Sequence, residues 1–380
     1  MKIYNSLTRK LELFAPLKKN KVKMYVCGIT PYDTTHLGHA FTYVFFDTLV
    51  RYFRFKKYDV DYVQNVTDID DDILKRAKKE KRDWRELGDF WTKNFLKDME
   101  SLNVLPPTHF VKATDSVALM IRIIRVLLDK RIAYEKEGNV YFDVGKFKDY
   151  GNLSRFTKKQ MILISKERGA DPSDPMKKDP LDFVLWQKFR LNEPSWDSPF
   201  GKGRPGWHIE CSAMINQYLG EKIDIHGGGR DLIFPHHESE IAQSESYTGK
   251  RPFVKYWMHT SMLIYQGEKM SKSLGNLVMV GDLLKKYSAN SIRFLLLSHH
   301  YRKPWELEED ELKNAEKLMK KIVREVNSNK RENHIDKKIL KIFEKAMNND
   351  FDIPKILFLF PKLLRLKDIY TLLYIMRILG

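Results

Sequence analysis

Two cysteines, a histidine and a glutamate are the residues of this chain best suited to bind a metal ion. Cys27 and Cys211 are the only cysteines, and His236 and Glu240 lie in the segment PHHESE. The acidic residues after Pro235 predict a helix beginning near this proline, in which residues four apart share one face. Two thiolates, an imidazole and a carboxylate form a set that zinc accepts as four ligands. The alternative is a pair of unrelated buried thiols beside a solvated helix.

The segment His36-Leu37-Gly38-His39 suits phosphate binding. It lies where a predicted strand turns into a helix, and the free N–H groups and dipole of a helix start attract phosphates. His36 and His39 are one turn apart and can donate hydrogen bonds to phosphate oxygens, while Gly38 lets a nucleobase lie against the helix. Histidines at this spacing are also common on solvated surfaces, so the segment is not specific by itself.

A cationic loop at 269–273 (KMSKS) suits the stabilisation of a leaving pyrophosphate. Lys269 and Lys272 are three residues apart, with serines beside them and Gly275 just beyond. A mobile loop of this kind can close on a triphosphate and stabilise the charge that builds on the departing group. The alternative is a solvated lysine–serine turn, and the pairing with HLGH favours the catalytic interpretation.

Hydrophobic periodicity predicts a parallel α/β sheet that positions these residues. Residues 23–29 and 59–64 are predicted as strands with an amphipathic helix over 36–55 between them, an order typical of a parallel sheet. The strand pattern returns at 222–226, before a run of three glycines. Further helices are predicted over 70–80, within 84–130, and over 308–327, 339–347 and 356–370, and a loop-heavy inserted stretch over 139–199.

The composition is that of a globular protein with either a polyanionic partner or a lysine-rich solvated surface. The chain has 380 residues, 43% of them hydrophobic, and a formal net charge of +17 that is not confined to one end. This length predicts two or three domains, and the positive field suits RNA. The first residues lack the apolar run of a signal peptide, and no apolar stretch approaches a membrane span. We therefore expect a cytoplasmic protein with no membrane segment and with reduced thiols.

The two short motifs together resemble the HIGH and KMSKS signatures of class I aminoacyl-tRNA synthetases. Four longer segments resemble cysteinyl-tRNA synthetase: 24–40 (MYVCGITPYDTTHLGHA), 65–71 (NVTDIDD), 206–214 (GWHIECSAM) and 224–243 (DIHGGGRDLIFPHHESEIAQ). The resemblance covers roughly residues 1–330. It implies an α/β fold, namely a class I synthetase Rossmann-type parallel sheet with an inserted subdomain and a short C-terminal helical bundle.

The resemblance also implies a division of the chain into four parts. Residues 1–135 would form the first half of the catalytic domain, with the HIGH-like motif, and 201–300 the second half, with the metal ligands and KMSKS. Residues 136–200 would form the inserted subdomain and 301–380 a helical stem or bundle. Relatives of familiar size continue into an anticodon-binding domain, which is expected to be absent here.

For the metal, the resemblance implies one Zn²⁺ per chain on Cys27, Cys211, His236 and Glu240. On an ideal helix of about 3.6 residues per turn, the neighbouring His237 points about 100° away from His236. We therefore expect His237 to pack nearby or to contact a ligand rather than the ion.

For the substrates, the resemblance implies that His36 and His39 hold the phosphates of Mg²⁺-bound ATP, while Lys269 and Lys272 follow the pyrophosphate. Trp207 is expected to form an apolar wall against the cysteine side chain. The remaining positions expected to hold the substrates are Gly28, Thr30, Asn65 and Thr67 for the amino acid, and Gly38, Thr42, Gly229 and Asp231 for the nucleotide. For Thr42, a role in helix packing is an equal alternative.

The function that the resemblance implies is activation of L-cysteine to cysteinyl-adenylate and transfer to tRNA(Cys) by a monomeric, AMP-forming ligase. The alternative is the cysteine ligase of mycothiol synthesis, which resembles the same core and passes cysteine to the amine of glucosaminyl-inositol. Glu240 as a fourth metal ligand and the charge of +17 favour tRNA. A third alternative is a non-catalytic RNA-binding relative, against which the intact HLGH and KMSKS segments argue.

Overall fold

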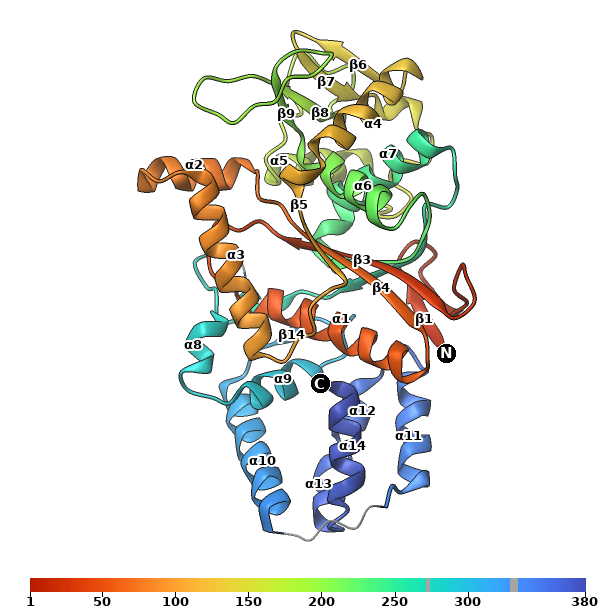
Figure 1. Cartoon of the computed structure of the whole chain (residues 1–380), viewed down its shortest axis with the longest axis vertical. Helices are drawn as coiled ribbons and strands as arrows, with labels where there is room; N and C mark the ends of the chain where they lie inside the picture. The colour runs from red at the N-terminus through yellow and green to blue at the C-terminus, as the bar shows by residue number, and fades with distance from the viewer. Residues whose placement is uncertain (271–273, 329–333) are drawn as a thin grey trace.

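The computed structural model describes residues 1–270, 274–328 and 334–380. Figure 1 shows three tiers along the long axis: a small sheet with helices at the top, a parallel sheet in the middle, and helices at the bottom. In the described part of the chain, no helix combines the length and the apolar character that a membrane span needs.

The middle tier is a five-stranded sheet in which every neighbouring pair is parallel. From β3 the chain first adds β4 and β5 on one side of the sheet, and later adds β10 and β11 on the other side, so that the direction reverses between β3 and β10. Its strand order is β11 (Val254–Thr260), β10 (Ile223–Gly229), β3 (Lys21–Ile29), β4 (Asp59–Val66) and β5 (His109–Lys112). The predicted α/β class with a parallel sheet is therefore confirmed.

Helices cover both faces of this sheet and give it two hydrophobic cores (Figure 1). On β3, Met24 and Val26 join the core on the side of the C-terminal helices, whereas Tyr25 and Cys27 join the opposite core. This is the two-residue alternation of a strand, and it directs Cys27 towards the upper tier. The helices concerned are α1 (Leu37–Phe55) on the lower face and α4 (Val117–Asp129), α6 (Trp207–Tyr218) and α7 (Glu238–Thr248) on the upper face.

The segment predicted to be filled with helices, 84–130, is interrupted by the edge strand of the sheet. After α2 (Asp71–Glu80) and α3 (Trp84–Ser101), strand β5 pairs with β4, and a 3₁₀ turn at Ala113–Ser116 leads into α4. Four residues are too few to show an alternating pattern among charged neighbours, so the sequence does not reveal this strand.

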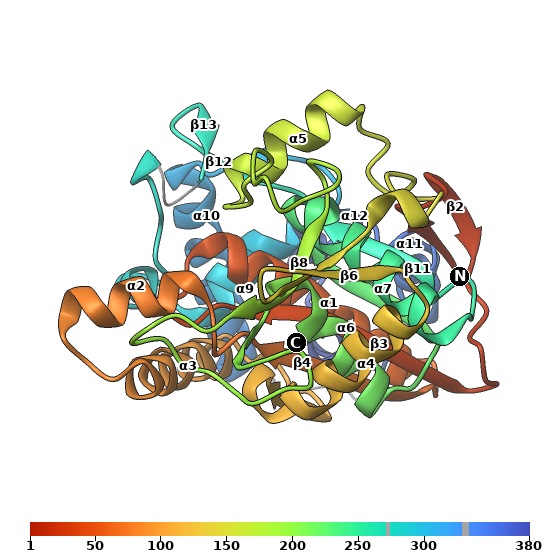
Figure 2. The ribbon, with the colours of Figure 1, turned by 90° about the horizontal axis from the view of Figure 1, so that it is seen from above.

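The upper tier is a four-stranded antiparallel sheet with one helix of its own. The order is β6 (Ala133–Lys136), β7 (Asn139–Phe142), β8 (Phe183–Lys188) and β9 (Gly203–Pro205). Helix α5 (Lys158–Glu167) begins with a capping box between Thr157 and Gln160, which satisfies backbone donors at its first turn. Figure 2, the view from above, places α5 on the same side of the molecule as strands β12 and β13.

Beyond the central sheet, a three-stranded sheet precedes the C-terminal helices. Its strand order is β13 (Glu268–Lys269), β12 (Leu263–Tyr265) and β14 (Trp305–Glu306). In the chain, α8 (Val280–Leu284) and α9 (Ala289–Leu297) lie between β13 and β14. An N-terminal hairpin of β1 (Lys2–Asn5) and β2 (Lys10–Leu13) lies beside β11, because the Ser6 amide donates to the Trp257 carbonyl.

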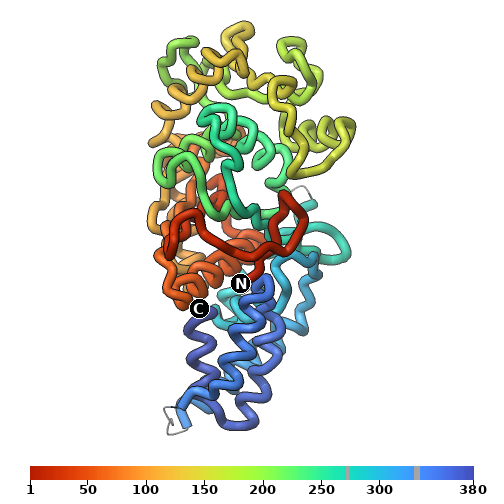
Figure 3. The backbone as a smooth tube through the Cα atoms, turned by 90° about the vertical axis from the view of Figure 1, so that its right-hand side faces the viewer, coloured from red at the N-terminus to blue at the C-terminus, as the bar shows by residue number. Residues whose placement is uncertain are grey.

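The lower tier consists of helices whose last member ends beside the central sheet (Figure 3). Its members are α10 (Glu309–Ser328), α11 (Lys337–Met347), α12 (Ile353–Leu357), α13 (Phe360–Arg365) and α14 (Ile369–Leu379). The single helix predicted over 356–370 is wrong, since α12, α13 and α14 are separate and Lys367 takes a left-handed φ of 56° between the last two. Figure 3 shows both chain ends at the junction between this tier and the central sheet.

Candidate active site

A cavity of about 930 Å³ opens at the carboxyl ends of β3 and β10. These two neighbouring strands are the point at which the order of the sheet reverses, where open α/β sheets bind their ligands. The predicted site residues that line it are Cys27, Gly28, Thr30, His36, Gly38, His39, Thr42, Asn65, Thr67, Trp207, Cys211, Gly229, Asp231 and His236. Residues far apart in the chain therefore meet in one space.

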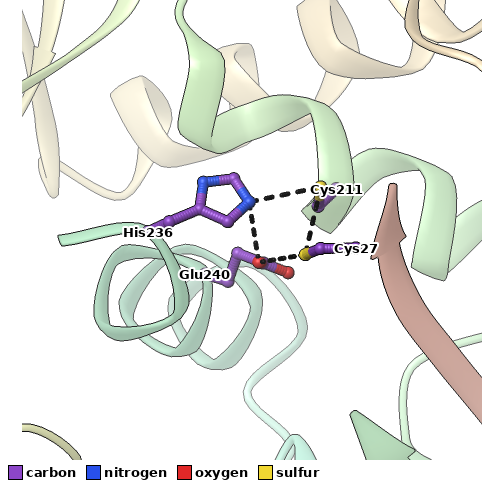
Figure 4. A group of neighbouring side chains, drawn as sticks. All are labelled: Cys27, Cys211, His236 and Glu240. Atoms are coloured by element: carbon purple, nitrogen blue, oxygen red, sulfur yellow. Dashed lines mark hydrogen bonds and ion pairs between the residues drawn. The ribbon is translucent and has the colours of Figure 1, made fainter. Parts of the chain in front are cut away.

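The four predicted metal ligands form a compact cluster (Figure 4). One donor atom from each of Cys27, Cys211, His236 and Glu240 lies within 4.8 Å of all the others. The two Sγ atoms are 3.9 Å apart, and Nε2 of His236 lies 3.3 Å from Cys211 Sγ and 3.1 Å from Glu240 Oε1. Glu240 Oε1 is 3.8 Å from Cys27 Sγ, which closes the square drawn in Figure 4.

Four elements bring these donors together, and His236 comes from the turn Ile233–His237 just before α7. Cys27 ends the inward-facing run of β3, Cys211 lies on α6, and Glu240 lies in the first turn of α7. All four residues are buried, with at most 5% of their surface exposed. The packing of α6 against α7 on one face of the sheet (Figure 1) places them this closely.

Burial leaves the charged forms of these donors poorly solvated. The directions of their pKa shifts therefore indicate whether a cation fits among them. Burial raises the pKa of the Cys27 thiol and of the Glu240 carboxyl, and it lowers the pKa of the His236 imidazole. A divalent ion among these groups would stabilise both thiolates and the carboxylate and would need the neutral imidazole. The donor set therefore fits a tetrahedrally coordinated soft or borderline cation such as zinc.

His237 packs beside the cluster and contacts a predicted ligand, as expected, since its Nε2 lies 3.3 Å from Cys27 Sγ. Residues Ile233–His237 form a π-helical turn in which Phe234 has non-helical angles (φ −137°, ψ 133°), and α7 begins only at Glu238. The non-helical residue precedes both His236 and His237, and His237 itself has helical angles (φ −67°, ψ −33°), so the two rings share one helical turn. The next residue, Glu238, is directed away from the cluster, and its carboxylate accepts the backbone N–H groups of Leu153 and Ser154.

The cluster is surrounded by additional histidines, which were not predicted from the sequence. His226 Nε2 lies 2.9 Å from Glu240 Oε2, and the ring of His226 stacks on Trp257 at 4.5 Å. His237 Nδ1 lies 2.8 Å from His259 Nε2. His208 Nδ1 lies 3.1 Å from His236 Nδ1. The one signal in the sequence is the position of His226 at the end of the predicted strand 222–226, just before the glycines.

Backbone and side-chain groups beside Cys27 define the floor of the cavity. The Gly28 amide donates to Asn65 Oδ1 (2.8 Å), and Asn65 Nδ2 donates to Thr67 Oγ1 (3.3 Å). A Cβ on Gly28 would lie 1.5 Å from the Asn65 carbonyl oxygen, so no larger residue fits. Trp207 stacks on His236 with 4.4 Å between ring centroids, which places an aromatic wall directly beside the cluster.

The two histidines of HLGH stack on each other at the start of α1, with ring centroids 3.6 Å apart. His36 is the N-cap, and its Nδ1 accepts the backbone N–H of His39 (3.2 Å). Burial lowers the pKa of His36 to about 4 and that of His39 well below its ordinary value. Both rings are therefore neutral at pH 7, and Nε2 of His36 is left as the N–H donor.

Because His36 is held neutral, the folded state is expected to lose stability in mild acid. Its pKa falls from 6.5 when unfolded to about 4 when folded, so between these values the unfolded chain binds the extra proton and stability rises with pH. From pH 7 to pH 4.5, this one group should cost about 2–3 kcal/mol. Urea unfolding at both pH values should show a smaller loss for His36→Asn, which retains a capping side chain. Equal losses in both proteins would contradict the assignment.

The residues predicted at the nucleotide end differ in the partners that their polar groups already have. The Thr42 hydroxyl lies 2.7 Å from that of Thr260 and also donates to the Gly38 carbonyl (3.3 Å), as a helix-packing threonine would. Asp231 follows β10 in a 3₁₀ turn and makes an ion pair with Arg168 (3.5 Å).

The predicted lysine loop is only partly described. Lys269 ends strand β13 and is exposed, and Met270 is buried beside the cavity. Lys272 lies outside the described residues. Just after the loop, the Leu37 amide donates to the Val278 carbonyl (2.8 Å), so the chain returns directly to HLGH.

Comparisons with known proteins agree with this geometry. The family profile of tRNA synthetases class I (C), catalytic domain, matches residues 13–317. A cysteine–tRNA ligase from Staphylothermus marinus is 45% identical over 94% of this chain and 77% of its own length. One from Dehalococcoides mccartyi is 48% identical over 93% of this chain and 77% of its own length.

Solved structures show the same fold at low identity. Mycobacterium tuberculosis methionyl-tRNA synthetase, solved with methionyl-adenylate, superposes with a TM-score of 0.63 at 15% identity, covering 92% of this chain and 82% of that one. The fold, the site at the reversal point of the sheet and the close relatives lead to one assignment: the chain belongs to the class I tRNA synthetase (C) family, that of the cysteine–tRNA ligases.

Proposed function

We propose that this chain activates L-cysteine with ATP and transfers it to tRNA(Cys), as an AMP-forming ligase. The observation that carries the proposal is the buried cluster of two thiols, an imidazole and a carboxylate beside HLGH, in a chain 45–48% identical to cysteine–tRNA ligases. No observation favours the amine of glucosaminyl-inositol as the acceptor. The net charge of +17 supports an RNA acceptor.

Cys27, Cys211, His236 and Glu240 would hold one zinc ion. When bound there, zinc supplies a preference for a soft thiolate over a hydroxyl, which distinguishes cysteine from serine where an apolar pocket discriminates weakly. His226 supports this set, since its contact with Glu240 Oε2 orients the carboxylate towards the other donors.

The floor of the cavity would hold the amino acid. Trp207 closes one side of the side-chain space. Asn65 is fixed by the Gly28 amide and in turn donates to Thr67, so this strand end presents ordered polar groups to the amino and carboxylate ends of the substrate. Thr30 lines the same wall. This arrangement positions the carboxylate near HLGH without any group that must remove a proton.

In the activation step, a carboxylate oxygen of cysteine attacks the α-phosphorus of ATP, and the bond to the bridging oxygen breaks to release pyrophosphate. The neutral rings of His36 and His39 donate hydrogen bonds to phosphate oxygens, while Gly38 leaves space for the adenine. Gly229 and Asp231 adjoin the ribose, and Thr42 contributes through packing. Lys269 and Lys272 accompany the pyrophosphate, and Mg²⁺ accompanies the ATP.

The parts of the chain would divide this work. Residues 1–135 and 201–300 form the two halves of the catalytic domain, 136–200 the inserted subdomain, and 301–380 the helical stem. We also propose that the protein acts as a monomer in the cytoplasm.

Two assays test this function in sequence. With cysteine, the protein should catalyse ATP–pyrophosphate exchange with a kcat/KM at least about 100-fold higher than with serine, and absence of exchange would reject an activating enzyme. The active enzyme is then given a tRNA(Cys) transcript or glucosaminyl-inositol with labelled cysteine. Label should enter the tRNA, and label in the amino sugar alone would favour the mycothiol-type ligase.

A further inference from the structure

The phosphate-binding motif leaves a charge to be explained. ATP carries several negative charges, but His36 and His39 are both neutral at pH 7 because burial lowers their pKa values. Neutral donors can orient phosphate oxygens, whereas stabilising the charge requires cations that stay protonated. The exposed side chain of Lys269 does not line the cavity. A cation that lines the cavity at the nucleotide end would stabilise this charge together with the lysine loop.

Five lysine and arginine residues line the cavity within the described part of the chain, and of these Arg168 is the one that pairs with a residue predicted at the nucleotide end, Asp231. Arg204 is buried and bonded to Asp71 and Glu193. Lys177 influences His208, at the metal-ligand end of the cavity. The full set is Lys75, Arg168, Lys177, Arg190 and Arg204, of which Lys75 and Arg190 pair with Asp72 (3.6 Å) and Glu193 (3.9 Å).

Arg168 is the cation that stands at the nucleotide end. It is the C-cap of α5, and Gly169 follows with a φ of +87°, so the chain turns away from the helix immediately after it. Residues 167–171 all line the cavity, so the turn borders the site. Arg168 pairs with Asp231, whose charge also acts on His36 across the cavity.

The ion pair between Arg168 and Asp231 is weak enough for either residue to bind a ligand instead. Its closest atoms are 3.5 Å apart, and about a third of each side chain is exposed, 33% for Arg168 and 32% for Asp231. A partly exposed pair of this kind contributes little to stability, so either partner can leave it at small cost. An arginine released here presents a planar fork of donors that matches phosphate oxygens.

We propose that Arg168, at the end of the upper-tier helix α5, is a phosphate-binding residue for ATP. When the nucleotide binds, the Arg168–Asp231 ion pair separates, Asp231 binds the ribose, and Arg168 binds the phosphates. This inference rests on the proposed function, since it assigns a further residue to the same nucleotide site. It gives the segment around α5 a direct part in activation.

Direct binding separates a phosphate contact from a general effect on the site. Arg168→Ala should weaken ATP binding, measured by calorimetry, about 10- to 100-fold, the usual range for a hydrogen bond to a charged group. Binding of adenosine, which has no phosphate, should change less than about 3-fold. Arg168→Lys should recover part of the loss, because it keeps the charge without the fork. Equal weakening of ATP and adenosine, or of neither, would overturn the proposal.

A matched control and a second background exclude a merely structural role. Lys166→Ala removes one positive charge from the last turn of α5, at a side chain that is exposed and does not line the cavity, and should bind ATP as the parent does. In an Asp231→Asn background, Arg168→Ala should still weaken ATP binding. If the effect disappears there, Arg168 acts only by holding Asp231 and the proposal fails.

The same variants distinguish this proposal from the proposed function. Exchange activity in the parent with unchanged ATP affinity in Arg168→Ala would reject the role of Arg168 alone. Selective ATP weakening in Arg168→Ala, in a parent that binds ATP and shows no exchange with cysteine, would support Arg168 and reject the cysteine-activating function.

Discussion

Replacing Cys211 by serine is expected to release bound zinc and to lower kcat/KM for cysteine activation more than about 100-fold. Even outer partners of metal ligands cost 10- to 100-fold when removed, and Cys211 would be a direct ligand. Its Sγ lies 3.3 Å from His236 Nε2 and 3.9 Å from Cys27 Sγ, so a hydroxyl at this position leaves three donors around a gap. Zinc content by atomic emission and ATP–pyrophosphate exchange with cysteine measure the two effects.

The adjacent Ser212 provides the matched control. It lies on the same helix and is 3% exposed, but it contributes no donor to the cluster. Ser212→Ala should therefore retain zinc and activity, which shows that a change on α6 does not by itself empty the site. Retention of one zinc per chain by Cys211→Ser, with cysteine still preferred over serine, would remove Cys211 from the ligand set.

The parts of the site that follow from local pattern could be predicted from the sequence. The strand carrying Cys27 and the helix beginning at HLGH were predicted within two residues of β3 and α1, because an apolar run and a long amphipathic period are strong signals. The parallel order also follows from strand, helix, strand. The joint position of Cys27, Cys211, His236 and Glu240 in one cluster rested on the family resemblance, since no local pattern links residues 184 positions apart.

What the sequence could not supply depends on backbone geometry that only packing determines. The contacts of His237 with Cys27 on β3 and with His259 on β11 depend on how the start of α7 packs against these strands, which no local pattern sets. The contact between Arg168 and Asp231 joins the upper tier to the central sheet, and neither residue has a pattern that points to the other. Strand β5 is similarly set by its pairing with β4 rather than by its four residues.

A second large effect is expected far from the cavity: Asp47→Asn should lower the free energy of unfolding by about 3–5 kcal/mol. Asp47 on α1 is fully buried and bonds Arg293 on α9, whose side chain is 4% exposed. Arg293 also donates to the Leu379 carbonyl (3.2 Å), so one guanidinium joins the central helix to the end of α14. An amide in place of the carboxylate leaves the arginine charge buried without its partner. Urea unfolding at pH 7 measures the change.

Two further variants show whether the cost arises from the uncompensated charge. Lys285→Ala removes a surface pair with Asp282, in which both side chains are more than 60% exposed, and should cost less than about 1 kcal/mol. The double variant Asp47→Asn, Arg293→Met should be more stable than Asp47→Asn alone, because removing both charges removes the desolvation penalty that one of them carries. If the double variant is instead the less stable, Arg293 stabilises the junction through its backbone contacts, and the charge of Asp47 is not what α9 and α14 require.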